Sequence, residues 1–327
     1  MARVGDGEKG GETVMNDTRD RRRILIYLLF AFGIAWAASL AVYLTGGLRD
    51  SPMVFPAANV SLALILLAGP VMWAPALAHV ATRLITGEGW GDAYLRPQLK
   101  RGWPYWVAAW TAPALLTIVG LAFYFLVFPG YYDADLTKLQ QMLEAAPVEP
   151  GEVNLWVLVA AQTVQALLIA PLINGIATFG EEFGWRGYLQ PKLMALGLSP
   201  RRVMMATGLV WGVWHWPAIL MGHNYGLDYP GAPFLGPLAM AWFTLTVGAL
   251  LGWLTFRARS VWPAVIGHAA LNGMANLGVI FVQGQPNSLL GPLPVGLVGG
   301  AGFGVVGLVL LLVPGLWQRG ADPSGPS

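Results

Sequence analysis

The sequence predicts an all-α, polytopic membrane protein, a bundle of about eight transmembrane helices around a polar cavity. Of the 327 residues, 56% are hydrophobic and 11% are charged, whereas soluble globular proteins carry about 25% charged residues. The 15 Trp and 42 Gly are typical of membrane helices, which place Trp at the membrane surface and tolerate Gly. A net charge of +2 without a basic patch gives no sign of a nucleic-acid partner. Because Cys is absent, thiol catalysis and cysteine zinc sites are excluded.

Each transmembrane helix needs roughly 20 predominantly apolar residues. The sequence contains eight such runs, at 24–45, 58–85, 103–129, 153–179, 202–221, 236–256, 262–282 and 294–316. The first run follows several arginines, as in a signal peptide, but it is long enough to span and no small-residue cleavage site follows it, so we expect an uncleaved helix.

We expect one transmembrane domain over residues 24–316. A flexible N-terminal tail over 1–23 and a C-terminal tail over 317–327 flank it, because both segments are polar and rich in Gly, Ser or Pro. In the loop 130–152, Leu136, Leu139 and Leu143 recur at helical spacing, which predicts a short helix at the membrane surface.

Basic residues gather in every second connection. They are Arg19, Arg21, Arg22, Arg23, Arg96, Lys100, Arg101, Lys192, Arg201, Arg202, Arg257, Arg259 and Arg319. The positive-inside rule places these segments, and with them both termini, in the cytoplasm. The bacterial character of the chain then predicts the bacterial cytoplasmic (inner) membrane.

Two adjacent carboxylates stand at the end of the fourth apolar run. Glu182 and Arg186 are i,i+4 neighbours and can pair on a helix. Glu181 lies about 100° away around the helix, so we expect it to remain unpaired. Two carboxylates in different environments can take different roles in acid–base chemistry.

The fifth and seventh runs add further polar groups. Trp211 and His215 share one helical face, and His268, Asn272 and Asn276 form a polar stripe. Ionisable side chains at membrane depth usually face the bundle interior or a wet cavity. A glutamate base with histidine and asparagine donors can hydrolyse an amide through water. For each residue alone, an interhelical hydrogen bond or a solvated helix end explains the sequence equally well; their combination favours a site.

In this order, the patterns EExxxR, aromatic-x-x-x-His and HxxxN resemble the CPBP family of CAAX prenyl-protein endopeptidases and their bacterial Abi-type relatives. The resemblance covers mainly residues 178–276 and implies an eight-helix bundle whose cavity opens to the cytoplasm. The residues that it marks are Glu181, Glu182, Arg186, Trp211, His215, His268 and Asn272. By this resemblance Glu181 is the catalytic base and Glu182 with Arg186 is the supporting pair. His215, His268 and Asn272 complete the site, and Trp211 stands where the family often has Phe.

Zinc is the one cofactor that the sequence leaves open. Glu181, His215 and His268 supply three O/N donors, the usual number at a catalytic zinc with an open fourth position. The second polar residue of HxxxN is an amide, however, which is a poor zinc ligand and a good oxyanion donor. The family resemblance allows a metalloprotease or a metal-free glutamate mechanism, and the residues favour the second.

The sequence therefore predicts an intramembrane endopeptidase, a hydrolase acting on a hydrophobic or lipidated peptide, with a prenylated CAAX-type peptide as one such substrate and membrane lipid as its surroundings. A proton-coupled transporter and a non-catalytic Abi-like immunity protein are the alternatives. Transporters commonly repeat their broken helices in both halves, whereas this polar cluster occupies only the second half. Nothing indicates an oligomeric state.

Two further patterns are interpreted as packing. Gly302, Gly304 and Gly307 match a dinucleotide-binding fingerprint, but no strand precedes them. Gly296, Gly300 and Gly304 instead form a small-xxx-small face, which predicts a close helix contact. His79, within the second run, has no comparable polar partner on its own helix and is interpreted as a packing residue or an interhelical polar contact.

Overall fold

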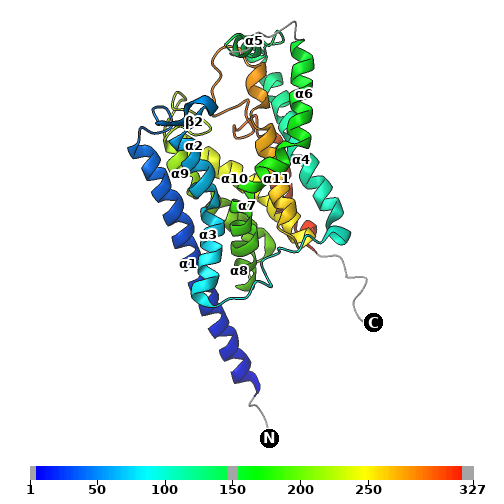
Figure 1. Ribbon diagram of the computed structural model, residues 1–327. Helices are drawn as coiled ribbons and strands as arrows, with labels where there is room; N and C mark the ends of the chain where they lie inside the picture. The colour runs from blue at the N-terminus through cyan, green and yellow to red at the C-terminus, as the bar shows by residue number, and fades with distance from the viewer. Residues whose placement is uncertain (1–4, 146–153, 319–327) are drawn as a thin grey trace.

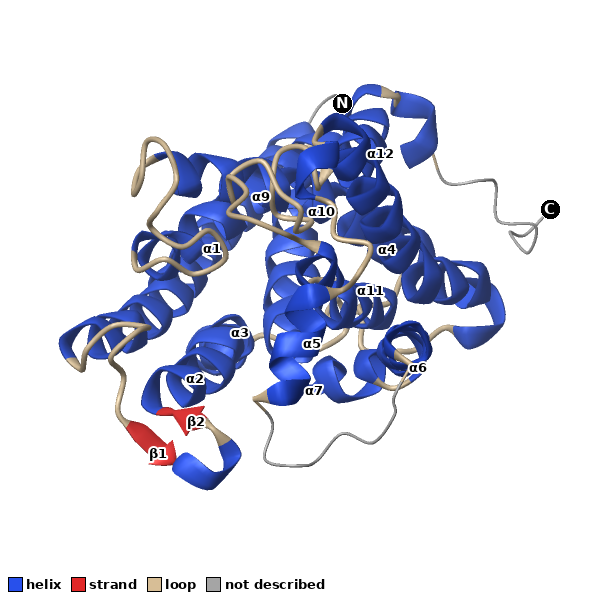
Figure 2. Cartoon of the chain, turned by 90° about the horizontal axis from the view of Figure 1, so that it is seen from above, coloured by secondary structure: helices blue, strands red, loops and turns tan. Residues whose placement is uncertain are grey.

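The computed structural model describes residues 5–145 and 154–318, and within them the elements of secondary structure are helices apart from one small hairpin (Figure 1). The helices are α1 Gly5–Leu44, α2 Leu62–Leu66, α3 Met72–Thr86, α4 Leu99–Val127, α5 Thr137–Glu144, α6 Leu155–Leu168, α7 Ala170–Gly184, α8 Gln190–Ala195, α9 Pro200–Leu220, α10 Leu235–Ala258, α11 Trp262–Met274 and α12 Ala301–Leu312. Strands β1 Met53–Phe55 and β2 Val60–Ser61 pair antiparallel at one edge of the bundle (Figure 2). The predicted all-α class is confirmed.

Six helices of the described residues are long and apolar enough to cross a membrane. Helix α6 and the α7–α8 segment together make a seventh span, bent by 46°. The predicted run 294–316 contains α12, an apolar helix of 12 residues, which is short for a span. The structure thus supports an integral membrane protein with six or seven spans, and the number eight stays a prediction.

Helix α1 extends beyond the first apolar run. It begins at Gly5, so helix runs through residues that the sequence assigned to a tail. Ion pairs at helical spacing support this extension: Asp17 pairs with Arg21 at 2.9 Å and Asp20 with Arg23 at 3.0 Å. Most of the predicted tail 317–327 lies outside the described residues.

The loop after α4 contains the expected short helix, α5. Leu139 of α5 is buried against Val159 of α6, together with Leu136. These contacts fasten α5 to the upper end of α6 in Figure 1, so the apolar stripe in this loop serves packing.

Helix α7 is a short central helix with a bend before it and a π-helical turn after it. At its start the chain bends after α6, and Pro171, which lacks a backbone N–H, lies in the first turn of α7. At its end α7 passes into a π-helical turn, Trp185–Leu189, before α8 begins. Such π-turns occur frequently at functional sites. This is the segment that carries the paired glutamates.

Two glycines bring α7 into backbone contact with α3. A Cβ at Gly184 would lie 2.3 Å from the Cβ of Pro75, and a Cβ at Gly180 would lie 2.6 Å from the carbonyl oxygen of Met72. Only glycine permits so close an approach. Because Gly180 directly precedes Glu181 and Gly184 follows Glu182 by two residues, the α3–α7 contact fixes where the carboxylates lie.

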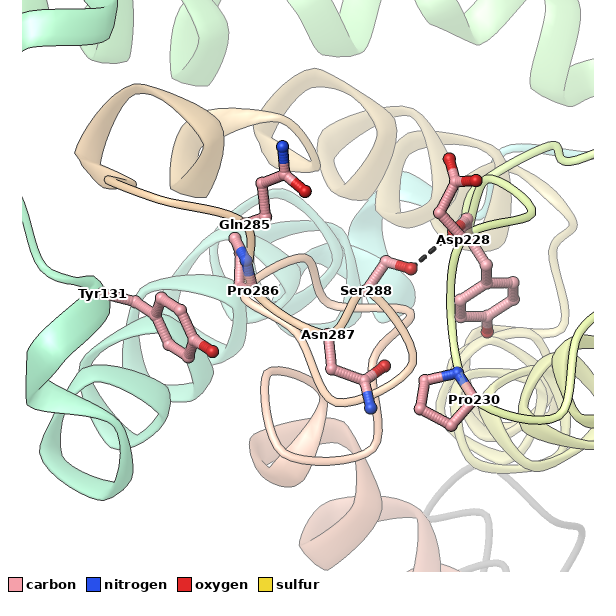
Figure 3. A pocket seen from close by; sticks show the side chains of 8 residues that line it. Tyr131, Asp228, Pro230, Gln285, Pro286, Asn287 and Ser288 are labelled. Atoms are coloured by element: carbon pink, nitrogen blue, oxygen red, sulfur yellow. Dashed lines mark hydrogen bonds between the residues drawn. The ribbon is translucent and has the colours of Figure 1, made fainter.

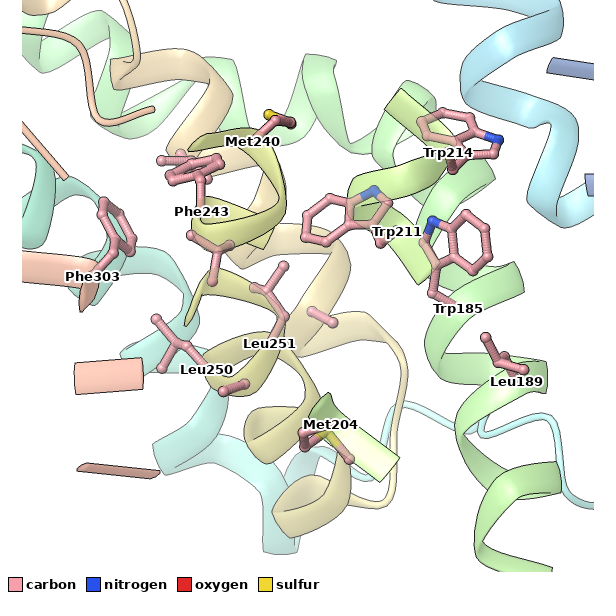
Figure 4. Close-up of a cluster of buried hydrophobic side chains, with 14 of the residues drawn as sticks. Trp185, Leu189, Met204, Trp211, Trp214, Met240, Phe243, Leu250, Leu251 and Phe303 are labelled. Atoms are coloured by element: carbon pink, nitrogen blue, oxygen red, sulfur yellow. The ribbon is translucent and has the colours of Figure 1, made fainter. Parts of the chain in front are cut away.

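The hydrophobic core surrounds α9 and α10, and Figure 4 shows its large side chains, among them Trp185, Trp211 and Trp214. Helix α10 is buried along most of its length. Here too glycine allows close packing: a Cβ at Gly208 of α9 would lie 2.8 Å from Cα of Leu245.

The predicted contact along Gly296, Gly300 and Gly304 is wrong in detail. Helix α12 begins only at Ala301, so Gly296 and Gly300 belong to the preceding turns and do not share a helical face with Gly304. The close approach is made by Gly307, where a Cβ would lie 2.6 Å from Cα of Thr246 on α10. The interpretation as packing holds, with a different residue.

An ion-pair cluster joins α1, α8 and the loop after α3, at the end of the bundle that holds the basic connections. Lys192 of α8 pairs with Glu88 and, at 3.1 Å, with Asp92. Arg23 of α1 approaches Glu88 at 3.5 Å. Burial alone would raise the pKa of Glu88, but hydrogen bonds from Lys192 and Tyr188 and the lysine charge outweigh it and lower that pKa. Glu88 is therefore a charged anchor between three segments.

Candidate active site

The seven residues marked by the sequence come together on three helices and one π-turn, and five of them line one cavity. They are Glu181 and Glu182 of α7, Arg186 of the π-turn, Trp211 and His215 of α9, and His268 and Asn272 of α11. The cavity has a volume of about 350 Å³, and Glu181, Trp211, His215, His268 and Asn272 line it. Its remaining wall is mostly apolar and includes Leu64, Leu67, Ala68 and Val71 of the segment before α3 and Met72 at the start of α3. Such a lining, apolar with a few convergent polar groups, is typical of a ligand site.

Glu182 is completely buried and has charged or polar partners on two elements. Arg186 Nη1 lies 3.1 Å from Oε1 and 3.0 Å from Oε2 of Glu182, which confirms the predicted i,i+4 pair. His268 Nδ1 from α11 lies 2.9 Å from Glu182 Oε1. The guanidinium of Arg186 also lies over the Trp211 ring, 4.7 Å from its centroid. Through these contacts the buried carboxylate of Glu182 links α7 with α11.

Glu181 has a different environment. Its only hydrogen bond within the described residues comes from Trp211, whose Nε1–H donates to Oε2 at 2.6 Å. Oε1 has no such partner, and the side chain borders the cavity. The two adjacent carboxylates are thus separated in role: one is held by charges, and one is held by a single neutral donor beside open space.

The imidazole of His215 has a defined orientation. Its Nδ1 lies 2.8 Å from the carbonyl oxygen of Trp211, and because a carbonyl can only accept, Nδ1 carries the proton. Its Nε2 is therefore left for a group in the cavity. The Trp214 ring packs edge-on against the imidazole, with centroids 4.7 Å apart. Figure 4 shows Trp211 and Trp214 on the same helix, one turn apart.

Asn272 borders the cavity and, within the described part of the chain, its amide makes no hydrogen bond. It can therefore donate to a bound oxygen. Asn276 does not extend this face, because α11 ends at Met274 and the chain then enters a 3₁₀ turn. The predicted stripe of three polar residues is thus reduced to His268 and Asn272.

The residues proposed for zinc do not form a ligand set. Among the described residues no group of three or more His, Asp or Glu side chains is arranged to hold a metal ion. The Nδ1 atoms of His268 and His215 are bound to Glu182 and to a carbonyl, so only their Nε2 atoms could ligate a metal. Three donors from Glu181, His215 and His268 would need to be drawn together, so the geometry does not fit a zinc centre.

The far side of the cavity is formed by His223 and Asn224 after α9 and by Pro294 and Val295. These residues lie at the end of the bundle away from α8 and the ion-pair cluster. A second cavity, of about 460 Å³, lies between loops that include Tyr131, Asp228 and Asn287 (Figure 3). It holds none of the predicted site residues. The predicted opening of the active-site cavity to the cytoplasm remains a prediction.

Sequence reasoning missed how the site is supported. The glycines on either side of the glutamate pair were a visible signal, since F-G-E-E-F-G places them at helical i,i+4 spacing. No pattern in the local sequence indicates the bond from His268 to Glu182 or the hydrogen bond that Trp211 donates to Glu181. The same is true of His79, whose Nδ1 lies 2.9 Å from the carbonyl oxygen of Phe183 on α7.

Comparison with known proteins agrees with the resemblance. Residues 156–274 match the family model described as Type II CAAX prenyl endopeptidase Rce1-like, and this segment includes every marked site residue. A protein of Methanococcus maripaludis named CAAX prenyl protease 2 is 30% identical over 97 residues. That alignment spans 29% of this chain and 35% of the relative. The chain is therefore similar to CAAX-type proteases in the part that carries the candidate site.

Proposed function

We propose that this protein is an intramembrane endopeptidase of the CAAX type, which hydrolyses a peptide bond in a hydrophobic or lipidated substrate such as a prenylated CAAX peptide. The observation that carries the proposal is the pair of adjacent carboxylates with different environments. Glu182 is fixed by Arg186 and His268, while Glu181 borders the cavity that His215 and Asn272 also line. The family match over residues 156–274 supports the same activity.

In the proposed mechanism Glu181 acts as general base. It takes a proton from a water molecule in the cavity, and the hydroxide attacks the carbonyl carbon of the scissile peptide bond. The Asn272 amide donates to the resulting oxyanion. The C–N bond then breaks, and the proton held by Glu181 passes to the departing amine.

In this scheme the two histidines orient the attacking water, because with the proton on Nδ1 the Nε2 atom of each neutral ring accepts a hydrogen bond. His268 is oriented by Glu182 through Nδ1, much as a buried carboxylate orients the imidazole of a catalytic triad. His215 is oriented through its own Nδ1 by a backbone carbonyl. Both imidazoles therefore present Nε2 to the cavity in a fixed direction, which pre-organises the polar groups before substrate binds.

We propose that the reaction needs no metal ion, because Glu181, His215 and His268 are not gathered into a ligand set. The test is cleavage after exhaustive treatment with a zinc chelator. Unchanged turnover supports the carboxylate mechanism. Loss of turnover that added zinc restores would overturn it.

The activity itself is tested with a fluorogenic prenylated CAAX peptide and purified protein in detergent. Glu181→Gln keeps the size of the side chain and removes the base, so we expect kcat to fall at least about 100-fold, within the range typical of general-base removal. Glu144→Gln on α5 is the matched control, because Glu144 is exposed and far from α7 along the chain. Equal cleavage by both variants would contradict the role of Glu181.

We also propose that the end of the bundle with α8 and both termini face the cytoplasm of a bacterial inner membrane. The positive-inside pattern of the basic connections supports this orientation. The chain contains no Cys, so single cysteines can be introduced at Arg257 and at Gln285 and treated with a membrane-impermeant thiol reagent outside intact cells. We expect the cysteine at position 285 to be labelled and the cysteine at position 257 to be protected. Labelling of residue 257 from outside would contradict the orientation.

A further inference from the structure

The bond from His79 to the catalytic-site helix is a contact that the proposed mechanism does not use. His79 lies on α3 and is completely buried. Its Nδ1 lies 2.9 Å from the carbonyl oxygen of Phe183, the residue that follows Glu182. Its ring also packs on the Phe183 ring, with centroids 4.2 Å apart. A buried imidazole thus contacts α7 beside the glutamate pair, two residues before the π-turn begins.

The proton on His79 is assigned by its second contact. Arg83 Nε lies 2.5 Å from His79 Nε2. A guanidinium can only donate, so Nε2 must accept and the imidazole must be neutral with its proton on Nδ1. That proton points to the Phe183 carbonyl, which accepts. A proton on Nε2 would point at the N–H of Arg83 Nε, so this geometry selects the neutral tautomer with its proton on Nδ1.

Arg83 is itself held in place. Its Nη2 donates to Asp92 Oδ1 at 2.6 Å, and its Nη1 donates to the Gly89 carbonyl. Its guanidinium lies 5.2 Å from the ring centroid of Trp90 and 5.2 Å from that of Tyr188. The loop after α3 therefore fixes Arg83, Arg83 fixes the His79 tautomer, and His79 holds α7.

The place of this contact matters because α7 carries both glutamates and then changes from α- to π-helical geometry. A helix that shifts or rotates at Phe183 carries Glu181 away from Trp211 and from the cavity. The glycine contacts at Gly180 and Gly184 limit the distance between α3 and α7, but glycine supplies no polar contact that would resist rotation. The hydrogen bond from His79 to the Phe183 carbonyl is directional and therefore resists rotation of α7.

We propose that His79 is a positioning residue that acts through the Phe183 carbonyl to set the orientation of the glutamate pair on α7. This inference rests on the proposed endopeptidase activity for its kinetic consequence. Its structural content, the direction in which residue 181 faces, can be measured without any cleavage. Arg83 and Asp92 contribute indirectly to this positioning, because Arg83 fixes the tautomer of His79 and Asp92 holds Arg83.

The test compares three substitutions of His79. The Asn amide nitrogen can occupy the place of Nδ1 and still donate to the carbonyl, whereas the Gln amide reaches only to the place of Nε2, and Phe keeps the ring without any donor. We expect His79→Asn to retain kcat within about threefold. We expect His79→Gln and His79→Phe to lose at least about tenfold in kcat, with KM changed less than about twofold, since a misplaced catalytic group costs rate.

A purely structural role predicts a different result. Each variant would then yield less folded protein with an unchanged kcat per folded molecule, and His79→Asn would be no better than His79→Gln. Activity is therefore normalised to the monodisperse fraction from size-exclusion chromatography. Equal kcat for the Asn and Gln variants on this basis would overturn the inference.

A second measurement does not depend on proteolysis. Glu181→Cys is a single cysteine in a chain that has none, and its modification by a small methanethiosulfonate reagent reports whether position 181 faces the cavity. We expect equal rates with His79 and with His79→Asn, and a rate changed at least about fivefold with His79→Phe. Equal rates in all three backgrounds would overturn the inference. If the wild-type chain cleaves no peptide, the proposed function fails, and the labelling rates alone decide the role of His79.

Discussion

Replacing Gly184 by alanine tests whether the α3–α7 contact fixes the site. The added Cβ would lie 2.3 Å from the Cβ and 2.5 Å from the carbonyl carbon of Pro75, where ordinary contacts are 3.4–4 Å. The obstacle is backbone and a proline ring, which cannot rotate away, so α3 and α7 must separate by about 1 Å. Overpacking of this kind costs about 1–3 kcal/mol. Alanine recovers up to about 1 kcal/mol through its higher helix propensity.

The matched control is Gly175→Ala on the same helix, where the nearest atom to the new Cβ is Val265 Cγ1 at 3.9 Å. This variant gains the helix propensity without the clash, so the two variants should differ by about 1–3 kcal/mol. Unfolding in mixed micelles with rising dodecyl sulfate measures that difference. A displacement of about 1 Å also costs about 100-fold in rate, so cleavage by Gly184→Ala should fall strongly and cleavage by Gly175→Ala should not. If both variants match the wild type in stability and cleavage, the reasoning from the contact distances is refuted.

Three further predictions concern the charges of the site and of the cluster near α8. Arg186→Met should destabilise by about 3–5 kcal/mol because it leaves a buried carboxylate without its cation; adding Glu182→Met should recover part of that loss in the same unfolding assay, and simple additivity would contradict the pairing. Trp211→Phe keeps the ring but removes the donor to Glu181, so kcat should fall about tenfold, the rate equivalent of about 1.5 kcal/mol for a hydrogen bond to a charged group, with KM unchanged; wild-type kcat would contradict this role. The lowered pKa of Glu88 means that its stabilising contribution is complete above its ordinary pKa of 4.5 and is lost as pH falls through the lower folded value. Melting temperature should therefore drop below about pH 4.5 in the wild type and drop less in Glu88→Gln, and equal pH profiles would contradict this.

Much of the architecture could be predicted because its causes are local. Apolar runs of span length predict helices wherever they occur, and i,i+4 spacing predicts the pair of Glu182 and Arg186, since both effects depend on neighbours along the chain. The convergence of α7, α9 and α11 was predicted from the order of polar residues and not from their contacts.

The features that escaped prediction depend on residues far apart in the sequence. His79 meets Phe183 across 104 positions, and His268 meets Glu182 across 86; no periodicity encodes such contacts. Residues 294–316 are apolar throughout, yet helix forms only from Ala301, because composition fixes where a chain avoids water but not where it becomes helical.

A completely buried ion pair is weak as a source of stability, because desolvation offsets most of the attraction between its charges. Glu182 and Arg186 must therefore be held by the elements around them. Helix α7 is held on one side by α3, through Gly184, and on the other by α11, where Thr178 Oγ1 donates to the Val265 carbonyl at 3.0 Å. The packing energy of these contacts offsets the cost of the buried charges, and in return Glu181 sits at the cavity with little freedom to move. Substitutions in the two helix contacts should therefore impair catalysis even where every polar residue of the site is intact.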